Sequence, residues 1–165
     1  MTATKTTRRT NAADHDKPAP KDAIALLRAD HTAVRQMFTD YEKTRSVATK
    51  MSLVADICSA LTVHAQIEEE IFYPAVKAAL KDKLLVPEAT VEHTSVKDLI
   101  AQLEGVEPDG EMYDAKVKVL SEYVKHHVQE EQNEMFPQAK ATSLDMVELG
   151  ARMATRRDDL LAQAA

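Results

Sequence analysis

Four apolar stripes at helical spacing run along this sequence, and each of them contains a histidine. Residues three and four positions apart share one face of a helix, so such a stripe marks the face that is buried. Two of the stripes also contain a glutamate. The members, stripe by stripe, are Leu27, His31, Val34, Phe38 and Tyr41; Ile57, Leu61, His64, Glu68, Ile71 and Ala75; Ala89, His93, Val96, Ile100 and Leu103; and Val117, Leu120, Val124, His127, Glu131 and Met135.

The segments between the stripes carry signals that end or begin helices. The run Leu84-Leu85-Val86-Pro87 follows the second stripe and is expected to end that helix. Residues 105–110, which contain two glycines and a proline, separate the third stripe from the fourth. Asp109 or Gly110 is expected to open the fourth helix.

A fifth, shorter helix is expected near the end of the chain. Ser143 is its expected N-cap, the helix runs to about Leu161, and Val147 and Leu160 are among its apolar positions. Short links between long helices favour antiparallel neighbours. The predicted fold is therefore all-α: an up-down-up-down four-helix bundle with a short additional C-terminal helix.

The first 20 residues differ from the rest of the sequence. They are polar, slightly basic and without apolar periodicity, so they bury too little surface to offset the entropy of ordering. We expect residues 1–20 to form a disordered polar tail and residues 21–165 to form a single helical domain.

Composition limits the classes of partner and compartment. The net charge of −6 argues against nucleic acid as the main partner, and no stretch approaches the roughly 18 apolar residues of a membrane span. A single cysteine, Cys58, cannot form an internal disulfide, which fits a reducing compartment. A cytoplasmic protein with neither a nucleic-acid nor a membrane partner is expected; any protein partner is left open.

Buried ionisable side chains need a reason to be buried. A lone buried carboxylate costs several kcal/mol, comparable to the whole stability of a small domain, unless it is paired, hydrogen-bonded or bound to a metal. Two carboxylates that converge would also repel each other unless a cation lay between them. Four histidines and two glutamates on four facing stripes therefore predict a metal site.

The spacing of these residues supports convergence. His64 and Glu68 are four residues apart, as are His127 and Glu131, so each pair lies on one helix face one turn apart. His31 and His93 add one nitrogen each from the other two helices. Imidazole with carboxylate suits iron, zinc or manganese rather than calcium. We expect two iron ions, with zinc or manganese as alternatives, bridged by the two glutamates.

The arrangement occurs twice in the sequence. The stretch His31-Thr-Ala-Val-Arg-Gln-Met-Phe is similar to His93-Thr-Ser-Val-Lys-Asp-Leu-Ile. The stretch from His64 to Pro74, HAQIEEEIFYP, is similar to the stretch from His127 to Pro137, HVQEEQNEMFP. Each half is thus a helix pair carrying H…H-x-x-x-E, and two such pairs would place equivalent ligands on each of two metals.

The prolines of this repeat can be interpreted in two ways. Pro74 and Pro137 remove the hydrogen bonds to the carbonyls of Glu70 and Asn133. One interpretation is a kink near the end of the helix. The other is that the kink helps to set the angle of the nearby glutamate.

These motifs resemble the hemerythrin-like (HHE cation-binding) domain family, from about Ala23 to Lys140. A relative of hemerythrin is an example of the same bundle topology. The predicted topology is therefore not independent of this resemblance. The resemblance implies a non-haem di-iron centre bridged by two carboxylates. The ligands that it implies are His31, His64, Glu68, His93, His127 and Glu131.

One departure from the family bears on function. Oxygen-carrying hemerythrins use five histidines, two of them one turn apart on the third helix, whereas the residues one turn from His93 are Ala89 and Lys97. Tyr123 and Glu92 are candidates to complete the second metal, and Tyr123 is alternatively a packed hydrogen-bond donor. A more open metal weakens simple oxygen carriage and admits peroxide, nitric oxide or hydrolytic chemistry.

Three functions therefore stay open. The first is a protein that binds or senses oxygen, nitric oxide or iron at a di-iron site; the second is a peroxide-degrading enzyme; the third is a structural metal site without turnover. The small-molecule partner is a diatomic ligand or peroxide.

Several other ionisable residues are not expected to be ligands. His126 is expected to face outward. Glu69, Glu70 and Glu130 are expected to form a solvated acidic face, with Glu69 alternatively beside the ligands. Cys58 is expected to be an inert filler.

Overall fold

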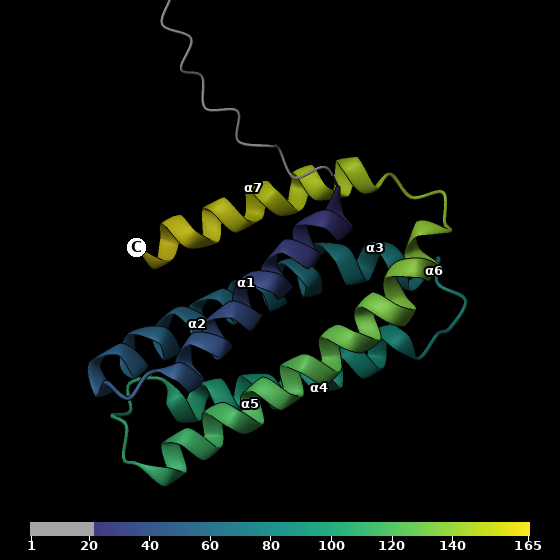
Figure 1. Ribbon diagram of the computed structural model, residues 1–165. Coiled ribbons are helices and arrows are strands. Elements are labelled where there is room, and N and C mark those ends of the chain that lie inside the picture. The colour runs from purple at the N-terminus through teal and green to yellow at the C-terminus, as the bar shows by residue number, and fades with distance from the viewer. Residues whose placement is uncertain (1–21) are drawn as a thin grey trace, which may run out of the picture.

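The computed structural model describes residues 22–165, and across this range the chain is helical and contains no strand (Figure 1). The tail expected over residues 1–20 lies outside the described residues. The elements in chain order are α1 (Ala23–Lys43), α2 (Val47–Ile67), the π-helix η1 (Glu68–Phe72), α3 (Tyr73–Lys77), α4 (Leu85–Leu103), α5 (Glu111–Glu130), the π-helix η2 (Glu131–Met135), α6 (Phe136–Lys140) and α7 (Met146–Ala164).

The four long helices form a closed bundle. α1 packs on α2, α2 on α4, α4 on α5, and α5 on α1, and the direction alternates along the chain. The last helix, α7, lies against α1 and α2 on the outside of the bundle, away from α4 and α5 (Figure 1). The predicted four-helix bundle with an additional C-terminal helix is confirmed.

Most helix ends follow the expected signals. Asp22 caps α1, where its carboxylate accepts a hydrogen bond from the backbone N–H of Ala25 at 2.7 Å. At the start of α5, Gly110 is the N-cap with φ of 92°, a conformation that favours glycine, and the Asp109 carboxylate accepts from the N–H of Tyr113 at 3.0 Å. The glycine and the aspartate thus both act at this end.

Two predicted boundaries were wrong. The run Leu84-Leu85-Val86-Pro87 does not end a helix: α3 ends at Lys77, and α4 begins at Leu85 with Pro87 in its first turn. Proline fits there because the first N–H groups of a helix have no intrahelical partner.

The second error concerns the last helix. Its N-cap is Asp145 rather than Ser143, because the Asp145 carboxylate accepts from the N–H groups of both Val147 and Glu148. Two hydrogen bonds at this carboxylate satisfy two otherwise unpaired donors. Val147 consequently faces solvent, with 65% of its surface exposed, whereas Leu160 is buried as predicted.

The π-helices begin at the two glutamates of the repeat. In each, the N–H of the residue before the proline donates to the carbonyl five residues earlier: Tyr73 to Glu68, and Phe136 to Glu131. The extra residue in the turn rotates all later residues by about 100°. Phe72, Tyr73 and Val76 are therefore buried, while Ile71 and Ala75 of the predicted stripe are half-buried.

Two apolar clusters fill the bundle on either side of the histidines. One lies near the start of α1 and includes Leu27, Phe72 and Phe136, and the other lies toward the opposite end and includes Phe38, Ile57 and Leu120. Cys58 belongs to the second cluster, and burial raises the pKa of its thiol to about 11, as fits an inert filler. The predicted polar residues therefore lie between the two clusters along the length of the bundle.

Because α7 lies so close to the start of α1, replacing Gly150 is predicted to have an unusual effect on stability. A Cβ on Gly150 would lie 2.7 Å from the backbone nitrogen of Ala23 and 2.7 Å from the backbone carbon of Asp22. Glycine to alanine in a helix normally stabilises by about 1 kcal/mol. We expect Gly150→Ala instead to lower the free energy of unfolding by about 1–3 kcal/mol, because neither backbone can yield freely. Urea unfolding measures this, and a stabilised variant would contradict the close contact.

Candidate metal centre

The six ionisable residues of the stripes meet in one buried layer of the bundle. Their side chains come from α1, from α2 and η1, from α4, and from α5 and η2. Glu68 and Glu131 are the most buried, with exposed fractions of 0% and 1%. The six are His31, His64, Glu68, His93, His127 and Glu131.

The histidines form two pairs. The Nε2 atoms of His31 and His64 lie 3.2 Å apart, and so do those of His93 and His127. Two nitrogens at that separation can each lie about 2.1 Å from a common cation, with an angle near 100° at the cation. Each pair therefore has the spacing of two ligands on one metal.

The two glutamates lie between the histidine pairs. For Glu131, Oε1 is 3.1 Å from Nε2 of His31, and Oε2 is 3.5 Å from Nε2 of His127. For Glu68, Oε1 contacts Nε2 of His64, and Oε2 is 3.5 Å from Nε2 of His93. Each carboxylate thus presents one oxygen to each pair, which is the arrangement of a bridging ligand.

Three of these four carboxylate oxygens have no hydrogen-bond partner. They are Oε1 and Oε2 of Glu68 and Oε1 of Glu131, and all three are buried. An unpaired buried carboxylate is among the most unfavourable groups that a protein can hold. A cation at each histidine pair would satisfy these oxygens, so the residues present fit a two-metal centre.

The outward nitrogens of the histidines are all held. Each Nδ1 contacts an acceptor, so its hydrogen donates outward and the lone pair of Nε2 points to the centre. The partners come from α1, η1, α4 and η2. The pairs are His31 with Gln132 (2.9 Å), His64 with Asp30 (3.0 Å), His93 with Glu69 (3.3 Å) and His127 with Glu92 (3.0 Å).

A basic side chain contacts each of the three carboxylates of this outer layer. Lys97 donates to Glu69 at 2.6 Å, and the exposed His126 lies 3.4 Å from Glu92. Arg157, on α7, donates to Asp30 at 3.0 Å. The C-terminal helix therefore contacts the centre through a hydrogen-bonded chain from Arg157 through Asp30 to His64, and Arg156 beside it pairs with Glu70 of η1.

Electrostatics in the metal-free centre favour protons where metals would bind. Burial by itself lowers the pKa of His64, but the Glu68 carboxylate and the hydrogen bonds to Asp30 and Glu68 outweigh it and raise that pKa to about 10. Burial likewise raises the pKa of Glu68, yet the adjacent His64 outweighs it and holds that pKa well below its usual range. Without a metal, the His64 imidazolium is thus held beside the Glu68 carboxylate.

Tyr73 is the functional residue that the sequence did not indicate. Its hydroxyl donates to Oε2 of Glu131 at 2.7 Å and lies 3.2 Å and 3.3 Å from Nε2 of His93 and His127. Burial and the charges of Glu68 and Glu131 raise its pKa well above the usual value, so the phenol keeps its proton near neutral pH. It lies at the pair that lacks the fifth histidine.

The two residues proposed to replace that histidine lie elsewhere. Tyr123 is 47% exposed, because it falls on the outer face of α5, and it is neither a ligand nor a packed donor. Glu92 contacts the outward nitrogen of His127 instead of the centre. His126 faces outward as expected, and Glu69 lies beside a ligand, the second of the two roles considered for it.

Comparison with known proteins agrees with this geometry. The family description "Hemerythrin HHE cation binding domain" matches residues 22–139. The chain belongs to the hemerythrin HHE cation-binding family. It is thus a metal-cation-binding protein, and the buried histidines and glutamates fit the site.

Relatives extend over most of the chain. An uncharacterised protein of Mycobacterium tuberculosis is 29% identical over 143 residues, covering 84% of this chain and 87% of the relative. A crystal structure of an HHE domain-containing protein from Mycobacterium kansasii has a TM-score of 0.73 at 25% identity, covering 87% of this chain and 89% of the other. A DNA nickase of Nostoc is 27% identical over 111 residues, which are 67% of this chain but 31% of that protein.

Membrane insertion has a simple structural test. Within residues 22–165, no helix is both long and apolar enough to cross a bilayer.

The proton-filled centre predicts that metal binding is linked to pH. Because the pKa of His64 is about 10, this imidazole carries a proton at pH 7.5 that a metal must displace. We expect proton release on binding, with affinity rising as pH rises toward 10 and falling as pH falls. Calorimetric titration of the metal-free protein with zinc, in buffers of different ionisation enthalpy, counts the protons. A heat of binding that does not depend on the buffer would contradict the protonated state.

Proposed function

We propose that this chain is a non-haem di-iron protein that binds a small ligand at a carboxylate-bridged centre. The observation that carries the proposal is the pair of buried glutamates, each of which spans the two histidine pairs, with three of their four oxygens lacking a hydrogen-bond partner. His31 and His64 would hold one iron, His93 and His127 the other, and Glu68 and Glu131 would bridge them.

Iron is the metal that the donor set and the family favour together. Mixed imidazole and carboxylate ligands suit iron, zinc and manganese, whereas calcium prefers oxygen alone. When bound, iron supplies redox chemistry and open coordination positions. The residues of this chain hold the donors in place, since every imidazole is fixed through its outward nitrogen.

The size of the space beside the histidines supports a small ligand. An inner cavity of about 30 Å³ is bounded by the four imidazoles and by apolar side chains that include Leu61 and Val96. A water-sized probe needs about 10–15 Å³, so this volume admits two or three heavy atoms. Oxygen, nitric oxide and peroxide are of this size.

Metal analysis tests the bridging scheme. Iron-reconstituted protein is expected to hold two irons per chain, and Glu68→Ala and Glu131→Ala are each expected to lose most of that iron, because both metals lose a shared ligand. Glu134→Ala is the matched control, since Glu134 is an exposed glutamate on the same π-helix as Glu131. One iron or none in the wild type, or full iron in both variants, would overturn the scheme.

A peroxide-degrading enzyme is the second candidate, and Tyr73 favours it. Its phenol is a proton donor beside His93 and His127 and is hydrogen-bonded to Glu131. Breaking an oxygen–oxygen bond requires protons, and a placed acid can supply them.

Replacement of Tyr73 separates the candidates. Tyr73→Phe removes the proton and keeps the ring that packs near Phe72. We expect the variant to keep two irons and, if peroxide is the substrate, to release oxygen from peroxide about 10²-fold more slowly. Oxygen release is measured electrochemically. If neither protein releases oxygen and the spectrum changes reversibly with oxygen, ligand binding is favoured. If both signals are absent, a structural metal site is favoured.

DNA cleavage is a weaker proposal than ligand binding or peroxide degradation. The chain corresponds to less than a third of the Nostoc nickase, and its net charge of −6 disfavours a polyanionic partner.

A further inference from the structure

The inner cavity beside the histidines borders a surface groove between α1 and α5. A groove of about 380 Å³ runs between α1 and α5, and it has three lining residues in common with the cavity: His31, Val124 and Val128. Figure 1 shows α1 and α5 side by side along this face. The two valines are half-buried and one turn apart on α5, so they stand between the groove and the cavity.

Other hollows do not offer the same connection. A small pocket between α4 and α5 shares only His127 with the inner cavity and measures about 10 Å³. The larger groove of about 740 Å³ beside α2 and α7 shares no lining residue with it. Of these hollows, the α1–α5 groove shares the most lining residues with the cavity, so side-chain motion at Val124 and Val128 would join the two.

We propose that ligands reach the metal centre through the α1–α5 groove, with Val124 and Val128 as the gate. The inference rests on the proposed di-iron function, and it concerns the route and the class of ligand. Apolar gate residues admit a small ligand one at a time and keep bulk water from the imidazoles. A change of rotamer at either valine, which packs at the edge of the bundle and not in its core, would open such a passage.

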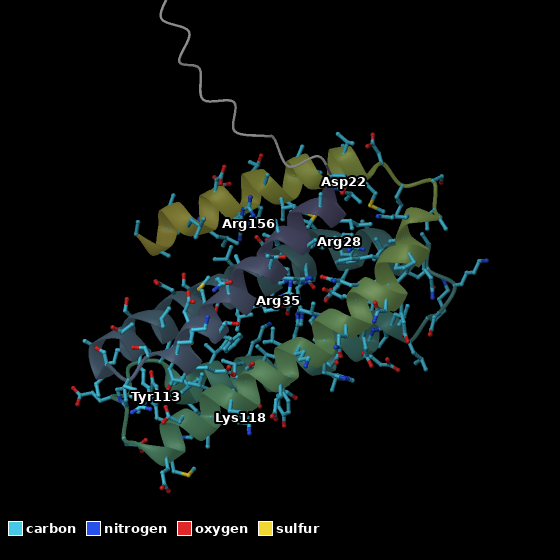
Figure 2. The ribbon with its side chains drawn as sticks, viewed as in Figure 1. Asp22, Arg28, Arg35, Tyr113, Lys118 and Arg156 are labelled. Carbon is cyan, nitrogen blue, oxygen red and sulfur yellow. The ribbon has the colours of Figure 1, made fainter. Side chains whose placement is uncertain are left out.

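Charges at the mouth of the groove favour an anion. Arg35 on α1 and Lys125 on α5 line it with one carboxylate, Glu42, and neither cation forms an ion pair within residues 22–165. Figure 2 shows Arg35 on the face shared by α1 and α5, with Lys118 further along α5. Unpaired cations at an opening raise the association rate of anions. A small anion of two or three heavy atoms would therefore associate faster than a neutral ligand of the same size.

Ligand kinetics test the gate. Iron-loaded protein is mixed with nitric oxide in the ferrous state, and association and dissociation rates are followed by absorbance. Val128→Phe is expected to slow association and dissociation about tenfold, because a gate raises the barrier in both directions. Val96→Ile is the control: Val96 lines the cavity but not the groove, so its replacement is expected to shift Kd and to leave the association rate within about twofold.

The charge is tested with azide on the ferric protein at about 0.1 M salt, where the Debye length is about 10 Å. Lys125→Glu is expected to slow azide association about tenfold and to leave nitric oxide association unchanged. Lys118→Glu makes the same change in net charge on the same helix outside the groove, and is expected to have little effect.

The outcomes separate the route from the function. Unchanged rates in Val128→Phe, with two irons bound, would overturn the gate while the di-iron centre stands. Equal effects of the two lysine variants on azide would overturn the charged mouth. Wild-type protein that holds fewer than two irons would instead overturn the proposed function.

Discussion

Two buried carboxylates in the middle of the bundle, with three of their four oxygens unpaired, are the constraint on which the rest of the structure depends. Glu68 and Glu131 are the most buried charged residues of the centre, and most of their oxygens accept no hydrogen bond. Such groups are tolerable only with positive charge beside them. A raised pKa lets His64 and His127 supply it as bound protons in the free protein, and the family identity indicates that metal cations supply it in use.

Much of the fold and of the centre was predictable, because helical periodicity and the spacing of histidine and glutamate are both local in the sequence. Helical periodicity placed His31, His64, His93 and His127 on buried faces, and all four are buried. The four-residue step from each second histidine to its glutamate needs only helix geometry. The bundle followed from the short links, and the family membership from the repeated motif with its proline, both of which are confirmed.

What could not be predicted depends on departures from α-helical geometry or on distant parts of the chain. The π-turn beginning at Glu68 rotates Tyr73 into the centre, and a pattern based on 3.6 residues per turn cannot show this. The choice of Asp145 over Ser143 as a cap depended on which side chain could reach two N–H groups.

The chain from Arg157 through Asp30 to His64 affects how this protein can be divided. The segment that matches the family ends at residue 139, whereas Arg157 lies on α7 beyond it. A boundary drawn at residue 139 would therefore remove the arginine that pairs with Asp30 and shorten the hydrogen-bonded chain behind a histidine of the centre. In physical terms the functional unit includes the last helix.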